Sequence, residues 1–167
     1  MEKNLLKNII NAPLEIIDLL SQEKAILNLI YNDKSNVLNY LDDEVNLEAL
    51  FKNEYVQLFS PLATEINHYQ TGIALSVVMD EIEFYENCVG MIRIYVSSDN
   101  SLIKLDGNKN RLLELVNRLV SVLDGTKLSS AGALKILNVN YVIVNENRSG
   151  YRINCAVSDY QSVKAEI

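Results

Sequence analysis

The stretch RIYVSSDNSLIKLDGNKNRLLELV, residues 93–116, decides the fold because it joins an alternating apolar run to a helical pattern through a polar loop. Before the loop, Ile94 and Val96 continue a period of two, which is typical of a strand with one buried face. After the loop, apolar residues recur at helical spacing, at Leu112, Val116, Leu119 and Leu123. The stretch therefore predicts a strand, a corner and an amphipathic helix that packs one side on a sheet.

The helix predicted over residues 111–123 has a polar side and a clear end. Arg111, Glu114 and Arg118 are expected on its solvent face, and the spacing of Glu114 and Arg118 suits an exposed ion pair. Gly125 follows the last core leucine and can adopt the left-handed conformation that ends a helix. Val116 and Leu119 should lie in the core.

The loop DNSLIKLDGN, residues 99–108, raises the question of a metal or phosphate site. It lacks both the acidic spacing of a calcium loop and the Gly-x-x-x-x-Gly-Lys pattern of a phosphate loop. Asp106 and Gly107 are typical of a turn, and Asn108 is a candidate helix cap. The loop is interpreted as a structural corner, and no metal or cofactor is expected anywhere in the chain.

Two pairs of strands flank this helix. Alternating apolar residues over 73–79 change parity between Asp80 and Ile82, which predicts either a turn or a bulge there, and alternation resumes over 90–96. These two strands should form a long hairpin linked near EFYENC. After the helix, strands are predicted in residues 133–146 and 150–160, separated by the turn-forming NRSG.

The first third of the chain is helical in pattern, with apolar doublets separated by polar pairs between Leu5 and Leu50. Two or three short helices are expected between Glu2 and Tyr31, with Pro13 in a first turn. The fold class is therefore α+β, with an antiparallel sheet of about four strands covered by one long helix and an N-terminal helical segment. We expect a single domain over residues 1–167, with a helical segment at 1–55 and an α+β core at 56–167.

Composition narrows the function. The net charge of -7 and the scatter of the 15 basic residues argue against a general nucleic-acid binder. His68 is the only histidine, which leaves no basis for a His-rich metal site or a catalytic triad, so no enzymatic activity is expected. Cys88 and Cys155 are expected to be buried free thiols. Neither a signal peptide nor a membrane span is expected, so the chain should be made in the cytoplasm.

Several segments of the second half resemble the small neck and tail-terminator proteins of tailed bacteriophages. The similar segments are IRIYVSS, RLLELVNRLVSVLDG, SSAGALKI and VNENRSGYRINCAVSDYQ. In that family a paired-strand unit precedes a helix with an Arg near its start, and the last strand reads Gly-Tyr-x-hydrophobic and ends near an Asp. The matching residues are Arg111, Gly132, Gly150, Tyr151 and Asp159. The N-terminal stretch of residues 11–33 also looks like the helical opening of such proteins.

The resemblance implies a structural virion protein that forms a homo-oligomeric ring, usually a hexamer, at the head-tail neck or at the tail end. Such a ring terminates the tail tube and contacts neck, tail-tube or sheath proteins. DNA would pass only as cargo, and no membrane is involved. Assembly would take place in the cytoplasm of the bacterial host.

The candidate protein interface is the hairpin tip formed by Glu83, Phe84, Tyr85 and Glu86. Aromatic residues between charges at a projecting tip are plausible anchors for a partner subunit. The alternative is that Phe84 folds back over the sheet. The alternative function is an acidic inhibitor or immunity-type protein that binds and masks a basic protein, since negative charge speeds such association.

Overall fold

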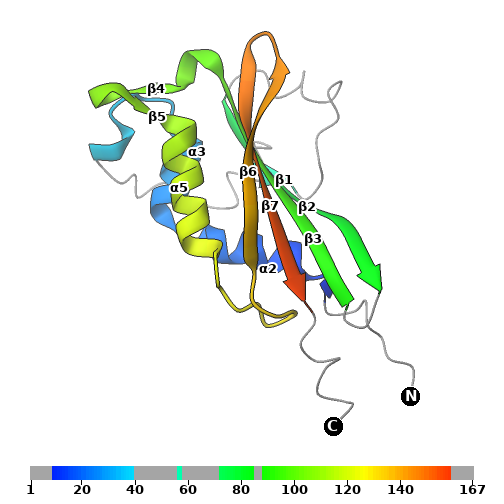
Figure 1. Ribbon diagram of the computed structural model, residues 1–167. Helices are drawn as coiled ribbons and strands as arrows, with labels where there is room; N and C mark the ends of the chain where they lie inside the picture. Colours follow the sequence, from blue (N-terminus) through cyan, green and yellow to red (C-terminus); the bar gives the residue numbers. More distant parts are fainter. Residues whose placement is uncertain (1–8, 40–55, 58–71, 85–87, 159–167) are drawn as a thin grey trace.

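A mixed sheet forms the centre of the part of the chain that is described (Figure 1), which comprises residues 9–39, 56–57, 72–84 and 88–158 of a computed structural model. Its four long strands lie in the order β2 (Ile73–Phe84), β3 (Cys88–Asp99), β7 (Arg148–Ser158) and β6 (Lys135–Asn145). Each is antiparallel to the next, which confirms the predicted α+β class. A two-residue strand that was not predicted, β1 (Val56–Gln57), pairs parallel with β2.

Three helices cover one face of this sheet (Figure 1), namely α2 (Ala12–Ser21), α3 (Lys24–Tyr31) and α5 (Arg111–Leu123). Helices α2 and α3 pack against β2, while α5 packs against β3, β7 and β6. The bounds of α5 are those predicted from apolar spacing. The sequence predicted that one long helix would cover the sheet. The helical layer is broader than that, because α2 and α3 share this face of the sheet with α5. As predicted, Pro13 lies in the first turn of its helix.

The core lies between the helices and the sheet. Leu119 is fully buried and Val116 is 8% exposed, which confirms both as core residues. The strands contribute every second residue, and in β3 these are Ile92, Ile94 and Val96. Alternation therefore works as the sequence predicted, because successive strand residues point to opposite faces.

The hairpin of β2 and β3 carries the predicted irregularity, since its register shifts between Met79 and Glu81. The turn between β6 and β7 differs from the prediction. Glu146 and Asn147 form it, while the following three residues, Arg148, Ser149 and Gly150, already pair with β3. The residue types of NRSG are common in turns, but Arg148, Ser149 and Gly150 lie in β7, where they pack closely against β3.

The corner before α5 is more ordered than a simple loop. It contains the 3-10 turns Asn100–Leu102 and Asp106–Asn108 and a small ribbon of β4 (Lys104–Leu105) with β5 (Lys109–Asn110). Gly107 and Asn108 both have positive φ, at 72° and 58°. The helix cap is Asn110, whose side chain accepts a hydrogen bond of 3.1 Å from the backbone N–H of Leu113. The prediction of Asn108 as the cap was therefore wrong by two residues.

Candidate protein interface

The predicted interface lies at the far end of the β2–β3 hairpin. Glu83 is exposed near the end of β2, and Phe84 is the last residue of that strand. Tyr85 and Glu86 fall outside the described residues, as does the side chain of Phe84. The structure thus places the beginning of the predicted cluster on the surface, and the role of its aromatic residues stays a prediction.

A second surface, which sequence reasoning did not single out, lies along β6 at the edge of the sheet. One row of paired residues crosses all four strands on the helix-facing side, from Val77 through Ile94 and Ile153 to Val139. The first three are fully buried, whereas Val139 is 39% exposed. In this row the helices cover the sheet as far as β7 and leave Val139 of β6 open to solvent, although α5 contacts β6 elsewhere.

In the neighbouring rows of paired residues, solvent exposure also increases from the central strands toward β6. Tyr141 and Ile143 are 58% and 75% exposed on β6, although they share rows with the buried residues Val96 and Ser98. The ring of Tyr141 meets that of Tyr151 edge to face, with centroids 5.5 Å apart. No strand in the described ranges pairs with the outer edge of β6. An exposed, apolar edge strand of this length is suited to pairing with another chain.

The only sequence signal for this edge was the run NVNYVIV, residues 138–144, in which apolar residues alternate with amides at first. Such a run predicts a strand with an apolar face, as was found. It does not reveal whether a helix covers that face, because the cover depends on where α5 lies in space.

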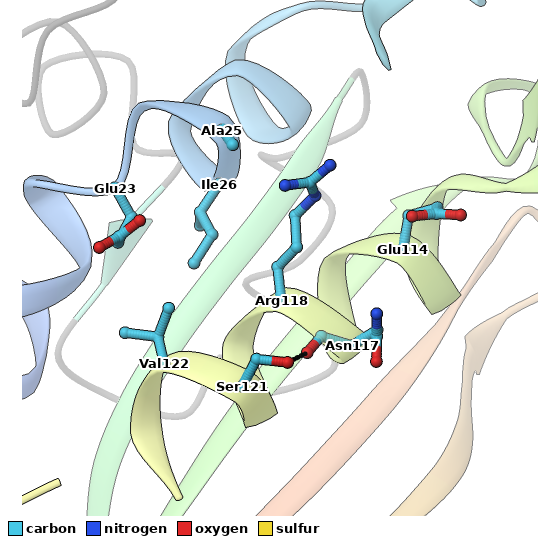
Figure 2. Close-up of a pocket in the computed structure, with 8 residues that line it drawn as sticks. All are labelled: Glu23, Ala25, Ile26, Glu114, Asn117, Arg118, Ser121 and Val122. Carbon is cyan, nitrogen blue, oxygen red and sulfur yellow. Dashed lines mark hydrogen bonds between the residues drawn. The ribbon is translucent and has the colours of Figure 1, made fainter.

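A groove of about 360 Å³ lies between α3 and α5 (Figure 2). Its lining consists of Glu23, Ala25, Ile26, Glu114, Asn117, Arg118, Ser121 and Val122. Figure 2 shows the side chain of Arg118 extending between the two helices, with Glu23 and Glu114 on either side. The hydroxyl of Ser121 is used within the helix, donating 2.7 Å to the backbone oxygen of Asn117. The groove therefore contains the charged side chains of Glu23, Glu114 and Arg118 between two helices. Its lining does not place a nucleophilic side chain next to a general base.

Arg111 is the most deeply buried charge among the residues that the structure describes, and its prediction as a solvent-facing residue was wrong. Its side chain is 0% exposed. The guanidinium donates hydrogen bonds of 2.5–3.1 Å to backbone oxygens, those of Leu29, Asn32, Asp33, Lys34 and Leu102. Most of these lie at and just beyond the C-terminal end of α3, where carbonyl groups lack helical partners. Arg111 therefore joins α5 to the end of α3.

Glu15 fastens α2 to the loop that precedes β6. Its carboxylate accepts hydrogen bonds from the backbone N–H groups of Ser129 and Ser130 and from the Ser130 hydroxyl. Desolvation by burial raises the pKa of Glu15, but the hydrogen bonds, led by that of the Ser130 hydroxyl, outweigh it and lower the pKa to about 2. This contact helps to position the start of β6.

Arg148 has a comparable structural use at the start of β7. It is 4% exposed and donates through Nε to the hydroxyl of Ser97 at 2.9 Å. Burial lowers the pKa of its guanidinium, and the nearby carboxylate of Asp99 offsets part of that effect. This buried cation thus connects β7 to β3.

The remaining predicted residues have no arrangement suited to catalysis among those described. Cys155 is a buried free thiol, as predicted. Desolvation by burial, with a smaller contribution from the negative charge of Asp124, raises the pKa of this thiol to about 12. Cys88 begins β3, and its side chain lies outside the described part, as do His68 and Asp159. Searching residues 9–39, 56–57, 72–84 and 88–158 gave no group of three or more potential metal ligands of the His, Cys, Asp and Glu types. Within the same ranges, no helix has the length and apolar character required to cross a membrane.

Comparison with known proteins gives a family. The model of the family named YomW, which is associated with bacteriophages, matches residues 23–157. A comparison with curated proteins gave no match. The family match confirms the association with bacteriophages that the resemblance implied. Because the match spans α3 and every described strand, the chain belongs to the YomW family.

Proposed function

We propose that this chain is a structural component of a tailed-phage particle, where copies of it form a ring at the head-tail neck or at the tail end. The observation that carries the proposal is the family match over residues 23–157, which places the chain among phage-associated proteins. The resemblance of its strand-helix-strand order to neck and tail-terminator proteins supports the position that we propose within the particle.

The surface supports an assembly role in this proposal. The outer strand β6 exposes Val139, Tyr141 and Ile143. The largest exposed apolar patches on soluble proteins often mark interaction sites. A ring arises when one surface of each copy contacts a different surface of the next, provided that the rotation closes. The ring would end the tail tube and give the next component a surface to bind.

The negative net charge of the chain is better suited to a channel through which DNA passes than to a site that binds DNA. The net charge is -7 and the 15 basic residues are scattered along the sequence, whereas phosphate binding requires clustered cations that release counterions. A ring of such subunits would let DNA move through without retaining it. We infer that the role is mechanical and that no reaction is catalysed.

Gold-labelled antibody against the chain tests this function on purified phage particles that encode it. The proposal predicts one cluster of label per particle, at the head-tail junction or at the tail end. A chain absent from particles and found instead as a monomer bound to a basic protein would contradict the virion role and support an inhibitor.

A further inference from the structure

Among the described strands, β2 has the second edge of the sheet besides that of β6, and this edge is only partly paired. Strand β1 covers β2 only at Leu75 and Ser76, so no described strand pairs with the outer side of β2 from Val77 to Phe84. The two edges lie at opposite ends of the strand order β1-β2-β3-β7-β6. A head-to-tail contact would bring β6 of one copy against β2 of the next.

The strand directions suit such a contact. Since β2, β3, β7 and β6 are each antiparallel to the next, β6 runs opposite to β2. Copies related by rotation about an axis along the strands keep these directions. The β6 strand of one copy and the β2 strand of its neighbour would therefore be antiparallel, and the sheet would continue across the boundary with unbroken alternation.

The charges of the two strands are complementary in this direction. Lys135 is the only charged residue of β6 and begins the strand, whereas Glu81 and Glu83 are exposed toward the end of β2. Antiparallel pairing brings these ends together. Lys135 and Glu81 belong to one row of the sheet, so Lys135 points to the same side as the acidic residues.

The irregularities of the two strands also match. The register of β6 shifts between Ile136 and Asn138, and that of β2 shifts between Met79 and Glu81. If Tyr141 lies opposite Val77 of the next copy, both shifts fall at the same level of the paired strands. In this register Val139 faces Met79, so an apolar residue meets an apolar one. Lys135 faces Glu83, so opposite charges also meet.

We propose that the ring is built by pairing of β6 in one copy with the segment Val77–Phe84 of β2 in the next copy. This inference rests on the proposed ring and identifies its contact. It also places the predicted interface residues Glu83 and Phe84 at the boundary, next to the beginning of the neighbour's β6. In this register Val139 and Tyr141 of β6 are buried in the assembly by the neighbour, opposite Met79 and Val77.

A pair of charge insertions tests the contribution of β6. The double variant Val139→Asp and Tyr141→Asp places carboxylates opposite Met79 and Val77 of the neighbour, in an apolar contact. Size-exclusion chromatography with light scattering should show the ring replaced by monomer, with far-UV circular dichroism unchanged. The matched control, Ile10→Asp with Leu14→Asp, changes apolar residues of comparable exposure, 56% and 50%, and should retain the ring. A ring that persists in the β6 variant overturns the inference.

Cysteine cross-linking tests the pairing itself and does not depend on disrupting it. In a Cys88→Ser background, chains with Lys135→Cys and chains with Glu83→Cys are mixed and oxidised. Disulfide-linked dimers should form in the mixture and be absent from either chain alone. A ring without this cross-link overturns the contact and leaves the ring intact. A Tyr141→Cys chain that links to itself through β6 shows a two-fold contact and overturns both the contact and the head-to-tail ring. A wild-type chain that stays monomeric overturns the ring as well.

Discussion

Arg111, the first residue of α5, donates a hydrogen bond of 2.5 Å to the backbone oxygen of Asn32, which lies 79 residues earlier and just beyond α3. The same guanidinium also reaches the carbonyl of Leu29 within α3. A cation at a helix C-terminus stabilises the helix through its dipole and its unpaired carbonyls. This one side chain therefore adds hydrogen bonds to the packing of α5 against the N-terminal helical segment.

Replacing Arg111 with Ala should therefore destabilise the fold strongly. Buried carbonyls would lose their donors, and each such loss costs about 1–3 kcal/mol. We expect the free energy of unfolding to fall by at least about 3 kcal/mol, measured by urea denaturation. Arg118→Ala, on the same helix, is the control and should cost much less. Equal losses in the two variants would show that the contacts of Arg111 are not important for stability.

Gly150→Ala should disturb the pairing of β3 with β7. A Cβ atom at this position would lie 2.0 Å from the backbone oxygen of Val96, so the strands would have to move apart. Overpacking of this kind costs about 1–3 kcal/mol. Gly90→Ala is the matched control, because its Cβ would meet only side-chain atoms of Ile9 and Met79, at 3.1 Å. Thermal melting should separate the two variants, and a larger loss at position 90 would contradict the close approach at Gly150.

The contact of Glu15 with the loop at Ser129 and Ser130 predicts a pH dependence of stability. The folded pKa of about 2 lies below the ordinary value of 4.5, so the contact stabilises the fold fully above pH 5 and is lost as pH falls toward 2. Glu15→Gln should thus be less stable than the wild type at pH 7, and the difference should shrink between pH 5 and 2. Glu23→Gln, which removes a carboxylate at an exposed position, is the matched control. Urea midpoints across this range provide the measurement, and a constant difference would contradict the assignment.

The sequence predicted α5 and the long strands well because their apolar residues repeat at regular spacing, which depends only on neighbours along the chain. It failed for Arg111 because a charged residue at the start of an amphipathic helix is usually solvated. The carbonyl groups that receive its hydrogen bonds come from a distant segment. The resemblance had singled out the same residue, although without a physical reason for it.

Only one of the two candidate interfaces, the end of the β2–β3 hairpin, could be predicted from the sequence, because the other depends on contacts between distant segments. The hairpin end at Glu83 follows from two strands and a short connection. The open face of β6 depends on how far α5 extends over the sheet, and spacing within β6 contains no information about that. Likewise, Arg148 and Ser149 were assigned to a turn by residue type, whereas tertiary packing places both in β7, two residues before the predicted start of the strand.

The aromatic residues at the hairpin tip provide a further prediction for assembly. Changing Phe84 and Tyr85 together to Ser should weaken association with neighbouring subunits while leaving far-UV circular dichroism and melting of the monomer nearly unchanged. Aromatic anchors contribute strongly to binding when a partner buries them. Loss of folding along with assembly would show that the pair belongs to the core. Unchanged assembly would show that the tip makes no contact.

Native mass spectrometry of the purified wild-type chain tests the central claim most directly, because it counts the copies in each assembly. The account predicts one closed oligomer of fixed copy number, a hexamer by the family resemblance, with few intermediates between it and the monomer. Head-to-tail contacts that close leave no free edge for further growth. A spectrum that contains only monomer at all concentrations, or an open series of growing oligomers, would contradict the ring.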